Sequence, residues 1–223
     1  MKITSIDIGW ENFAIAIELV KNTAIKEFIR KYDQLDKVDK IIERRAHTPI
    51  LKKMLNDLYK SSKNVYINLV DMNNGQKGGL QNSTRRNLAK YLKSIKHLLQ
   101  DSDYIIIEQQ FKTGQEMNFD AVLFGESCYS WLVVNLPDVN VSYTPSRYKT
   151  CIMGCPREVI IEQPNGLRTI RKIEKRDRKK WSVEMAKHIF KTRNQEFIIP
   201  KKGDDVSDCV LLIFAFVLKT FVI

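Results

Sequence analysis

The chain has 223 residues, of which 43% are hydrophobic, so it can bury a substantial core and fits one domain, or one domain with an insertion. Lys and Arg number 37 against 26 Asp and Glu, and the net charge of +11 favours nucleic acid or an anionic membrane surface as partner, with solubility as the simpler explanation. The N-terminus lacks the layout of a secretory signal, and the C-terminal apolar run is too short and too charged for a membrane span. Four scattered cysteines favour a reducing compartment over a disulfide framework: Cys128, Cys151, Cys155 and Cys209.

The first third of the chain opens with β-branched and apolar runs. Residues 2–8 predict a strand, Gly9 ends it, and residues 13–20 predict a second strand. A third strand is expected over residues 24–32, which would complete an antiparallel meander. Residues 41–58 have helical spacing of apolar positions.

The middle of the chain alternates predicted helices and strands. Residues 64–72 predict a short strand or an extended loop, and residues 83–99 predict a helix with leucines at three- and four-residue spacing. Residues 103–110 contain a continuous apolar run typical of a buried strand, and residues 119–136 predict an apolar helix. This alternation indicates an α/β layout with a mixed sheet.

The last third is predicted to contain a strand over 139–145, a basic segment over 146–180, and helices over 180–190 and 204–218. The basic segment carries 11 Lys and Arg against 4 Asp and Glu, so it holds +7 of the net charge. The excess positive charge of the chain is therefore local to this segment.

Carboxylates stand at the polar ends of several apolar elements. Asp204 suits the N-cap of the last helix, and Asp205 and Asp208, three positions apart, would share one helix face. Asp7 ends the first strand, and Glu108 follows the apolar run of a central strand. Each acid alone has an ordinary structural explanation as a turn, cap or strand-end residue. Together they favour a shared site for a hard divalent cation such as Mg²⁺.

The pattern "DIG" on the first strand, "IIIEQQ" on a central strand and D-x-x-D on the last helix resembles the RuvC-type nucleases of the ribonuclease H-like superfamily. The chain looks most like the poxvirus Holliday junction resolvases. The segment "KKGDDVSDC" in particular resembles the poxviral and the fungal mitochondrial members. The segments "TPSRYKTCIMG" (144–154) and "KWSVEM" (180–185) are also similar to family segments. The stretch 156–178 between them is longer than the resemblance implies, so we expect a basic, DNA-facing insertion over 146–180 in which 156–178 forms a hairpin or a flexible arm. The resemblance implies a ribonuclease H-like mixed five-stranded sheet flanked by helices, forming a single nuclease domain over 1–223.

The resemblance also implies residue roles. Asp7, Glu108, Asp205 and Asp208 would bind two Mg²⁺ ions, for which Mn²⁺ would substitute, with Asp204 as an alternative to Asp205. Lys149 and Lys180 match family lysines near the scissile phosphate, and charge neutralisation along the DNA backbone explains them equally well. The basic residues expected to bind DNA are Arg147, Lys149, Arg168, Arg171, Lys172, Lys175, Arg176, Arg178 and Lys179.

By the same resemblance, the chain would be a metal-dependent endonuclease that resolves four-way and other branched DNA by paired nicks with 5′-phosphate ends. Paired nicks predict a homodimer, and no membrane contact is expected. The poxviral similarity implies processing of viral genome concatemers in the cytoplasm of an infected cell, with the virion as a second location. The alternatives are a broad-specificity branched-DNA nuclease and a non-catalytic nucleic-acid-binding protein. Sugar kinases and actin-like ATPases also begin with D-x-G, but the second D-x-G loop and glycine-rich adenosine site they need are not found in the sequence.

Overall fold

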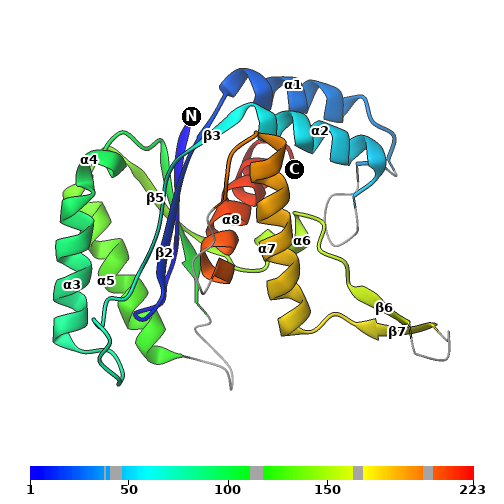
Figure 1. Ribbon diagram of the computed structural model, residues 1–223. Coiled ribbons are helices and arrows are strands. Elements are labelled where there is room, and N and C mark those ends of the chain that lie inside the picture. The colour runs from blue at the N-terminus through cyan, green and yellow to red at the C-terminus, as the bar shows by residue number, and fades with distance from the viewer. Residues whose placement is uncertain (38, 41–46, 111–117, 163–167, 198–202) are drawn as a thin grey trace.

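The computed structural model describes the chain except for residues 38, 41–46, 111–117, 163–167 and 198–202. The described part forms a five-stranded mixed sheet in the order β3-β2-β1-β4-β5 (Figure 1). The strands are β1 (Lys2–Asp7), β2 (Phe13–Val20), β3 (Ser62–Val70), β4 (Tyr104–Gln109) and β5 (Asn140–Pro145). Strand β1 is antiparallel to β2 and parallel to β4, and β4 is parallel to β5.

Helices cover both faces of the sheet. The helices α3 and α5 lie on one face, and α1, α2, α7 and α8 lie on the other (Figure 1). The helix bounds are α1 (Asn22–Asp33), α2 (Pro49–Lys60), α3 (Asn82–Ser94), α4 (Lys96–Leu99), α5 (Phe119–Asn135), α6 (Tyr148–Cys151), α7 (Lys175–Thr192) and α8 (Gly203–Phe221). Within the described ranges, no helix is both long and apolar enough to span a bilayer.

Alternation along the central strands divides the core into two. On β1, Ile3 packs with α8 while Ile6 packs on the opposite face, and on β4 Ile106 and Ile107 divide in the same way. Side chains two residues apart share a face of a strand. Residues Asp7 and Glu108 therefore lie on the face that α8 covers.

The expected third strand over residues 24–32 is wrong. These residues belong to α1, in which Ile25, Phe28 and Tyr32 are buried and the charged residues between them face solvent. The spacing of three and four residues between the buried side chains is helical, and it outweighs their β propensity. The third strand of the meander is β3, within the segment expected to be either a strand or an extended loop.

Three smaller differences concern element boundaries. The helix expected over 83–99 is divided at Ile95 into α3 and α4, and α7 begins at Lys175 rather than at 180. Asp204 is not an N-cap, because α8 begins at Gly203 and Asp204 lies in its first turn. Of the helical spacing expected over 41–58, residues 41–46 lie outside the described part, and α2 accounts for the rest.

The basic segment contains a two-stranded antiparallel ribbon formed by β6 (Glu158–Glu162) and β7 (Arg168–Lys172). This ribbon projects from the body of the molecule beyond the N-terminal end of α7 (Figure 1). The two antiparallel strands agree with the expected hairpin. That the segment is an insertion and that it contacts DNA both stay predictions.

Candidate active site

Two carboxylates meet because the central parallel strands end together. The register between β1 and β4 pairs Ile6 with Ile107, so Asp7 and Glu108 are the next residues along adjacent strands. Gly9 follows directly, in the turn to β2, where an added Cβ would lie 3.0 Å from the Asn12 carbonyl oxygen. A larger residue at this position would therefore need the backbone at Asn12 to shift.

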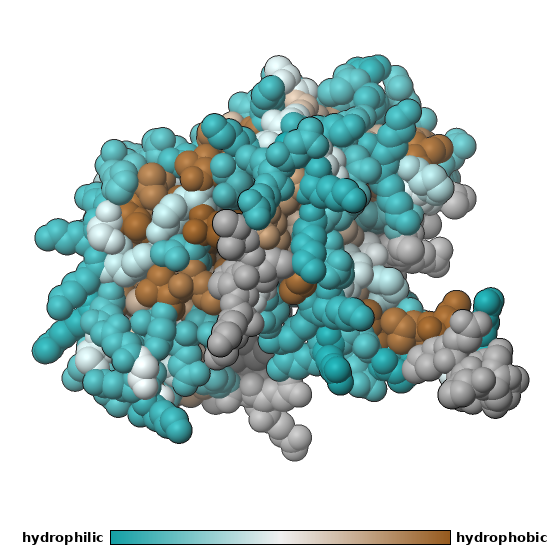
Figure 2. Space-filling model, in the orientation of Figure 1, coloured by the Kyte–Doolittle hydropathy of each residue, from teal (hydrophilic) through white to brown (hydrophobic). Residues whose placement is uncertain are grey.

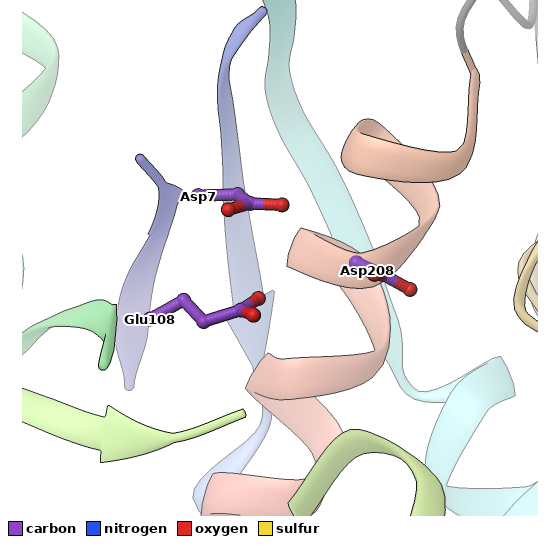
Figure 3. A group of neighbouring side chains, drawn as sticks. All are labelled: Asp7, Glu108 and Asp208. Carbon is purple, nitrogen blue, oxygen red and sulfur yellow. The ribbon is translucent and has the colours of Figure 1, made fainter. Parts of the chain in front are cut away.

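A third carboxylate comes from the second turn of α8. Asp7, Glu108 and Asp208 each offer an oxygen, and these oxygens all lie within 4.8 Å of one another. Figure 3 shows the Asp7 and Glu108 side chains extending from adjacent strands toward α8, the helix that carries Asp208. This end of α8 is held in part by the Ser207 hydroxyl, which donates to the Gly203 carbonyl oxygen at 2.6 Å.

Lys149 brings a positive charge into this group of carboxylates. It lies on α6, directly after β5, and its Nζ donates to Glu108 Oε2 at 2.7 Å and to Asp208 Oδ2 at 2.5 Å. All three side chains are nearly buried, with exposed fractions of 13%, 10% and 14% for Lys149, Glu108 and Asp208. Three carboxylates and one ammonium leave a formal charge of −2 in the group when every member is ionised.

The electrostatics of the group reflect this excess of negative charge. Burial, followed by the charge of Glu108, raises the pKa of Asp7 well above its usual range. Burial also raises the pKa of Glu108, although Lys149 opposes the shift. Burial alone would lower the pKa of Lys149, but the surrounding carboxylates outweigh it and the pKa is raised. The ammonium therefore stays charged while the carboxylates are short of compensating charge.

The remaining acids of α8 lie beside this group. Burial and the neighbouring Asp204 raise the pKa of Asp205 to about 6, and the Asp205 charge is among those that raise the pKa of Asp7. Asp204 instead forms an ion pair with Lys179 of α7. Of the two candidates for a further ligand, Asp205 is electrostatically coupled to Asp7, and Asp204 is engaged by Lys179.

The donor set of the group fits a hard divalent cation. All candidate ligand atoms are carboxylate oxygens, which Mg²⁺ and Mn²⁺ prefer. The second oxygen of Asp208, Oδ1, is buried and has no hydrogen-bond partner among the described residues. A buried carboxylate oxygen without a partner is costly, and a bound cation would satisfy it.

The basic residues singled out in the sequence occupy different places. Lys149 is inside the carboxylate group, Lys179 is paired with Asp204, and Lys180 is exposed on α7. Arg171 bonds to Glu174 and Asp177 at 3.1 and 2.8 Å, and so joins the ribbon to the start of α7. The others are exposed in the turn before α6, on β7 and in the first turn of α7: Arg147, Arg168, Lys172, Lys175, Arg176 and Arg178.

Sequence reasoning did not anticipate two sets of buried ionic contacts, one in the carboxylate group and one in the core. It placed Lys149 near a phosphate but not between two carboxylates. The position of Lys149 just after β5, the strand that pairs with β4, is a signal for its contact with Glu108. It also missed a buried ion pair in the core, in which Arg193 Nη1 lies 2.9 Å from Glu18 Oε2. The two residues are far apart in the sequence, and nothing in their local patterns connects them.

No family model and no curated protein matches the chain. Solved structures do match. Thermus thermophilus RuvC is similar with a TM-score of 0.52 and 10% identity, over 99% of this chain and 98% of that chain. T. thermophilus RuvC in complex with a Holliday junction substrate is similar with a TM-score of 0.53 and 9% identity, over 100% and 98%. The fowlpox virus Holliday junction resolvase shows a weaker similarity, with a TM-score of 0.49 and 17% identity over 98% and 99%.

The similarity to RuvC extends over essentially the whole chain. The expectation of an α/β, RuvC-type fold with a mixed five-stranded sheet flanked by helices is therefore confirmed. At these identities the comparison defines the fold, and the chemistry has to be argued from the site.

Proposed function

We propose that the chain is a metal-dependent endonuclease that resolves four-way DNA junctions and other branched DNA. One observation carries the proposal: three buried or half-buried carboxylates from β1, β4 and α8 converge within 4.8 Å in a RuvC-type fold. The Holliday junction substrate of the similar T. thermophilus RuvC complex supports branched DNA as the substrate class.

Asp7, Glu108 and Asp208 would hold the metal ion, and Asp205 is the proposed further ligand if two ions bind. When bound, such ions polarise a phosphoryl oxygen and activate a water molecule as nucleophile. We infer Mg²⁺ as the natural ion, with Mn²⁺ as a substitute, and products with 5′-phosphate ends.

Lys149 has a separate proposed part in the site. Its ammonium holds Glu108 and Asp208 in place by two short hydrogen bonds and offsets one of the three negative charges. A buried cation of this kind also gives a scissile phosphate a positive group at the edge of an otherwise acidic site. Lys180, at the exposed surface of α7, is proposed to act on the DNA backbone.

Substrate binding is proposed to use the exposed cations of the turn before α6, of β7 and of the first turn of α7. These residues carry no evident means of reading bases, so they would supply affinity through phosphate contacts that weaken steeply with salt. Recognition would then depend on the geometry of the branch.

The proposal also includes the oligomeric state of the protein and the place where it acts. Paired nicks across a two-fold junction need two active sites, so we infer a homodimer of single-domain subunits. The proposed natural role is the processing of viral genome concatemers in the cytoplasm of an infected cell.

The test is cleavage of an end-labelled four-way junction beside a linear duplex of the same arm sequence, in Mg²⁺ and in EDTA. The wild-type protein should nick the junction only with metal, and Asp208→Asn should abolish nicking. Asp204→Asn, one turn away and paired with Lys179, is the matched control and should retain it. Equal cleavage of the duplex would make the protein a broad nuclease, and junction binding without nicking in Mg²⁺ or Mn²⁺ would overturn the nuclease proposal.

A further inference from the structure

The ribbon of β6 and β7 is attached at both ends to elements that contribute to the carboxylate site. The chain leaves the site through α6, which carries Lys149, and returns through α7, which carries Lys179. Between them the two five-residue strands extend for about 17 Å, at roughly 3.3 Å per residue. The ribbon is therefore anchored beside the candidate active site and reaches away from it (Figure 1).

One face of the ribbon has an apolar pair at its centre that is open to solvent. Ile160 and Ile170 lie directly opposite each other in the antiparallel register, and their exposed fractions are 69% and 70%. Figure 2 shows this hydrophobic patch on the projecting ribbon. Exposed apolar patches on such elements mark binding sites, and a two-stranded ribbon alone is only marginally stable in water.

Contacts on the opposite face and at the base hold the ribbon to the rest of the molecule. Arg171, which lies on that face, bonds to Glu174 and Asp177 at the start of α7. At the base of the ribbon, the Ile173 N–H donates to the Arg157 carbonyl oxygen at 2.8 Å. These contacts join the ribbon to the body through one face and leave the isoleucine face free to contact a partner.

The charge around the pair favours DNA as that partner. Lys172 and Arg168 lie two residues on either side of Ile170 and so share its face of the ribbon, where they are paired in the register with Glu158 and Glu162 of β6. The positive excess therefore comes from the segment around the ribbon and not from this face alone. The surrounding segment, residues 146–180, has 11 basic and 4 acidic residues, a net charge of +7. Two isoleucine side chains also offer far less than the ~800 Å² per partner that a standard protein interface buries, so a second copy of the chain is the weaker candidate.

We propose that Ile160 and Ile170 form an apolar wedge that contacts unstacked bases at the branch point of a DNA junction, while cations of the surrounding basic segment contact phosphates. This inference rests on the proposed function. Isoleucine is among the side chains that proteins insert between base steps, and the cost of unstacking is smallest where bases are already unpaired. The wedge would make the affinity depend on the branch and not only on the charge of the DNA.

The test compares the affinity for a four-way junction with that for a linear duplex of one arm, at one salt concentration and in EDTA so that no cleavage follows. The variant is Ile160→Thr with Ile170→Thr, which keeps β-branched residues in both strands and so preserves the ribbon. The control is Ile50→Thr with Val65→Thr, two exposed aliphatic residues on α2 and β3. A 2-aminopurine base beside the branch point reports unstacking independently.

We expect the ribbon variant to lose roughly tenfold in junction affinity, the scale of removing about one buried methylene group at each of the two positions, and to change duplex affinity less than about twofold. It should also lose the 2-aminopurine signal, and the control should behave as wild type. Unchanged junction affinity, or an equal loss on the duplex, would overturn the wedge. So would conversion of a dimer to a monomer in sedimentation, which would assign the pair to a second copy. A wild-type protein with no preference for the junction would instead overturn the proposed function.

Discussion

Asp7→Asn should make the metal-free protein more stable and remove its stabilisation by Mg²⁺. Two carboxylate oxygens 4.8 Å apart repel by about 3.5 kcal/mol at an effective dielectric constant of about 20, and Asp7 lies within this distance of Glu108 and Asp208. The attraction to Lys149 offsets one of these repulsions. Protonation of Asp7 relieves part of the remaining repulsion, because the pKa of Asp7 is raised by burial and by Glu108. A net gain of about 1–3 kcal/mol remains, or roughly 2–12 °C in Tm for a chain of this length.

Thermal unfolding in EDTA and in Mg²⁺ measures both effects. Mg²⁺ at about 100 times its Kd should stabilise the wild type by about 2.7 kcal/mol and leave Asp7→Asn unchanged. Asp138→Asn, at an exposed position after α5, is the control and should stay within about 0.5 kcal/mol of wild type. The reasoning is refuted if Asp7→Asn is less stable than wild type in EDTA, or if it keeps the shift with Mg²⁺.

Three further predictions concern other buried charged or titratable side chains. Lys149→Met leaves a formal charge of −3 among the carboxylates, so calorimetry should show Mn²⁺ binding tighter by roughly tenfold or more, while stability in EDTA falls. Arg193→Met leaves the buried Glu18 carboxylate without its cation and should cost about 3–5 kcal/mol in urea unfolding, whereas replacing both residues with Met should cost much less. Burial lowers the pKa of His47, so the folded state prefers the neutral ring. Stability should therefore fall as the pH drops below about 6.5, where the unfolded chain takes up a proton, and His47→Gln should flatten this loss.

Each of these outcomes has a clear contrary result. Weaker Mn²⁺ binding in Lys149→Met would mean that the ammonium helps to hold the ion and does not compete with it. A double Met variant as unstable as Arg193→Met would show that the lost packing, and not the unpaired charge, sets the cost. Identical pH profiles for His47→Gln and wild type would remove His47 as a source of acid sensitivity.

The central strands and the last helix could be predicted because their sequences carry strong, local signals. The apolar runs that end at Asp7 and Glu108 are long enough to indicate buried strands, and a buried strand ending in a carboxylate indicates a polar site. The same local reasoning failed over residues 24–32. The prediction gave more weight to the β-branched residues than to the helical spacing of Ile25, Phe28 and Tyr32, and the segment is a helix.

The partners of the acids could not be predicted, because they depend on how distant elements pack. Asp204, Asp205 and Asp208 are nearly equivalent in the sequence, but the position of α8 against the sheet brings Asp208 to Asp7 and turns Asp204 towards Lys179. The direct contact of Lys149 with two carboxylates similarly depends on packing. It forms because β5 pairs with β4 and α6 begins shortly after β5 ends. The assignment of metal ligands stays a prediction that the variants above can test.

The most direct test of the account is ligation of the products of a cleaved four-way junction. Symmetric paired nicks that leave 5′ phosphates would convert the junction into two nicked duplexes, and DNA ligase should seal both to full length. This result should require Mg²⁺ or Mn²⁺ and should be absent with Asp208→Asn. Products that cannot be sealed, or sealed products formed equally well by Asp208→Asn or in EDTA, would contradict a metal-dependent junction resolvase built on these carboxylates.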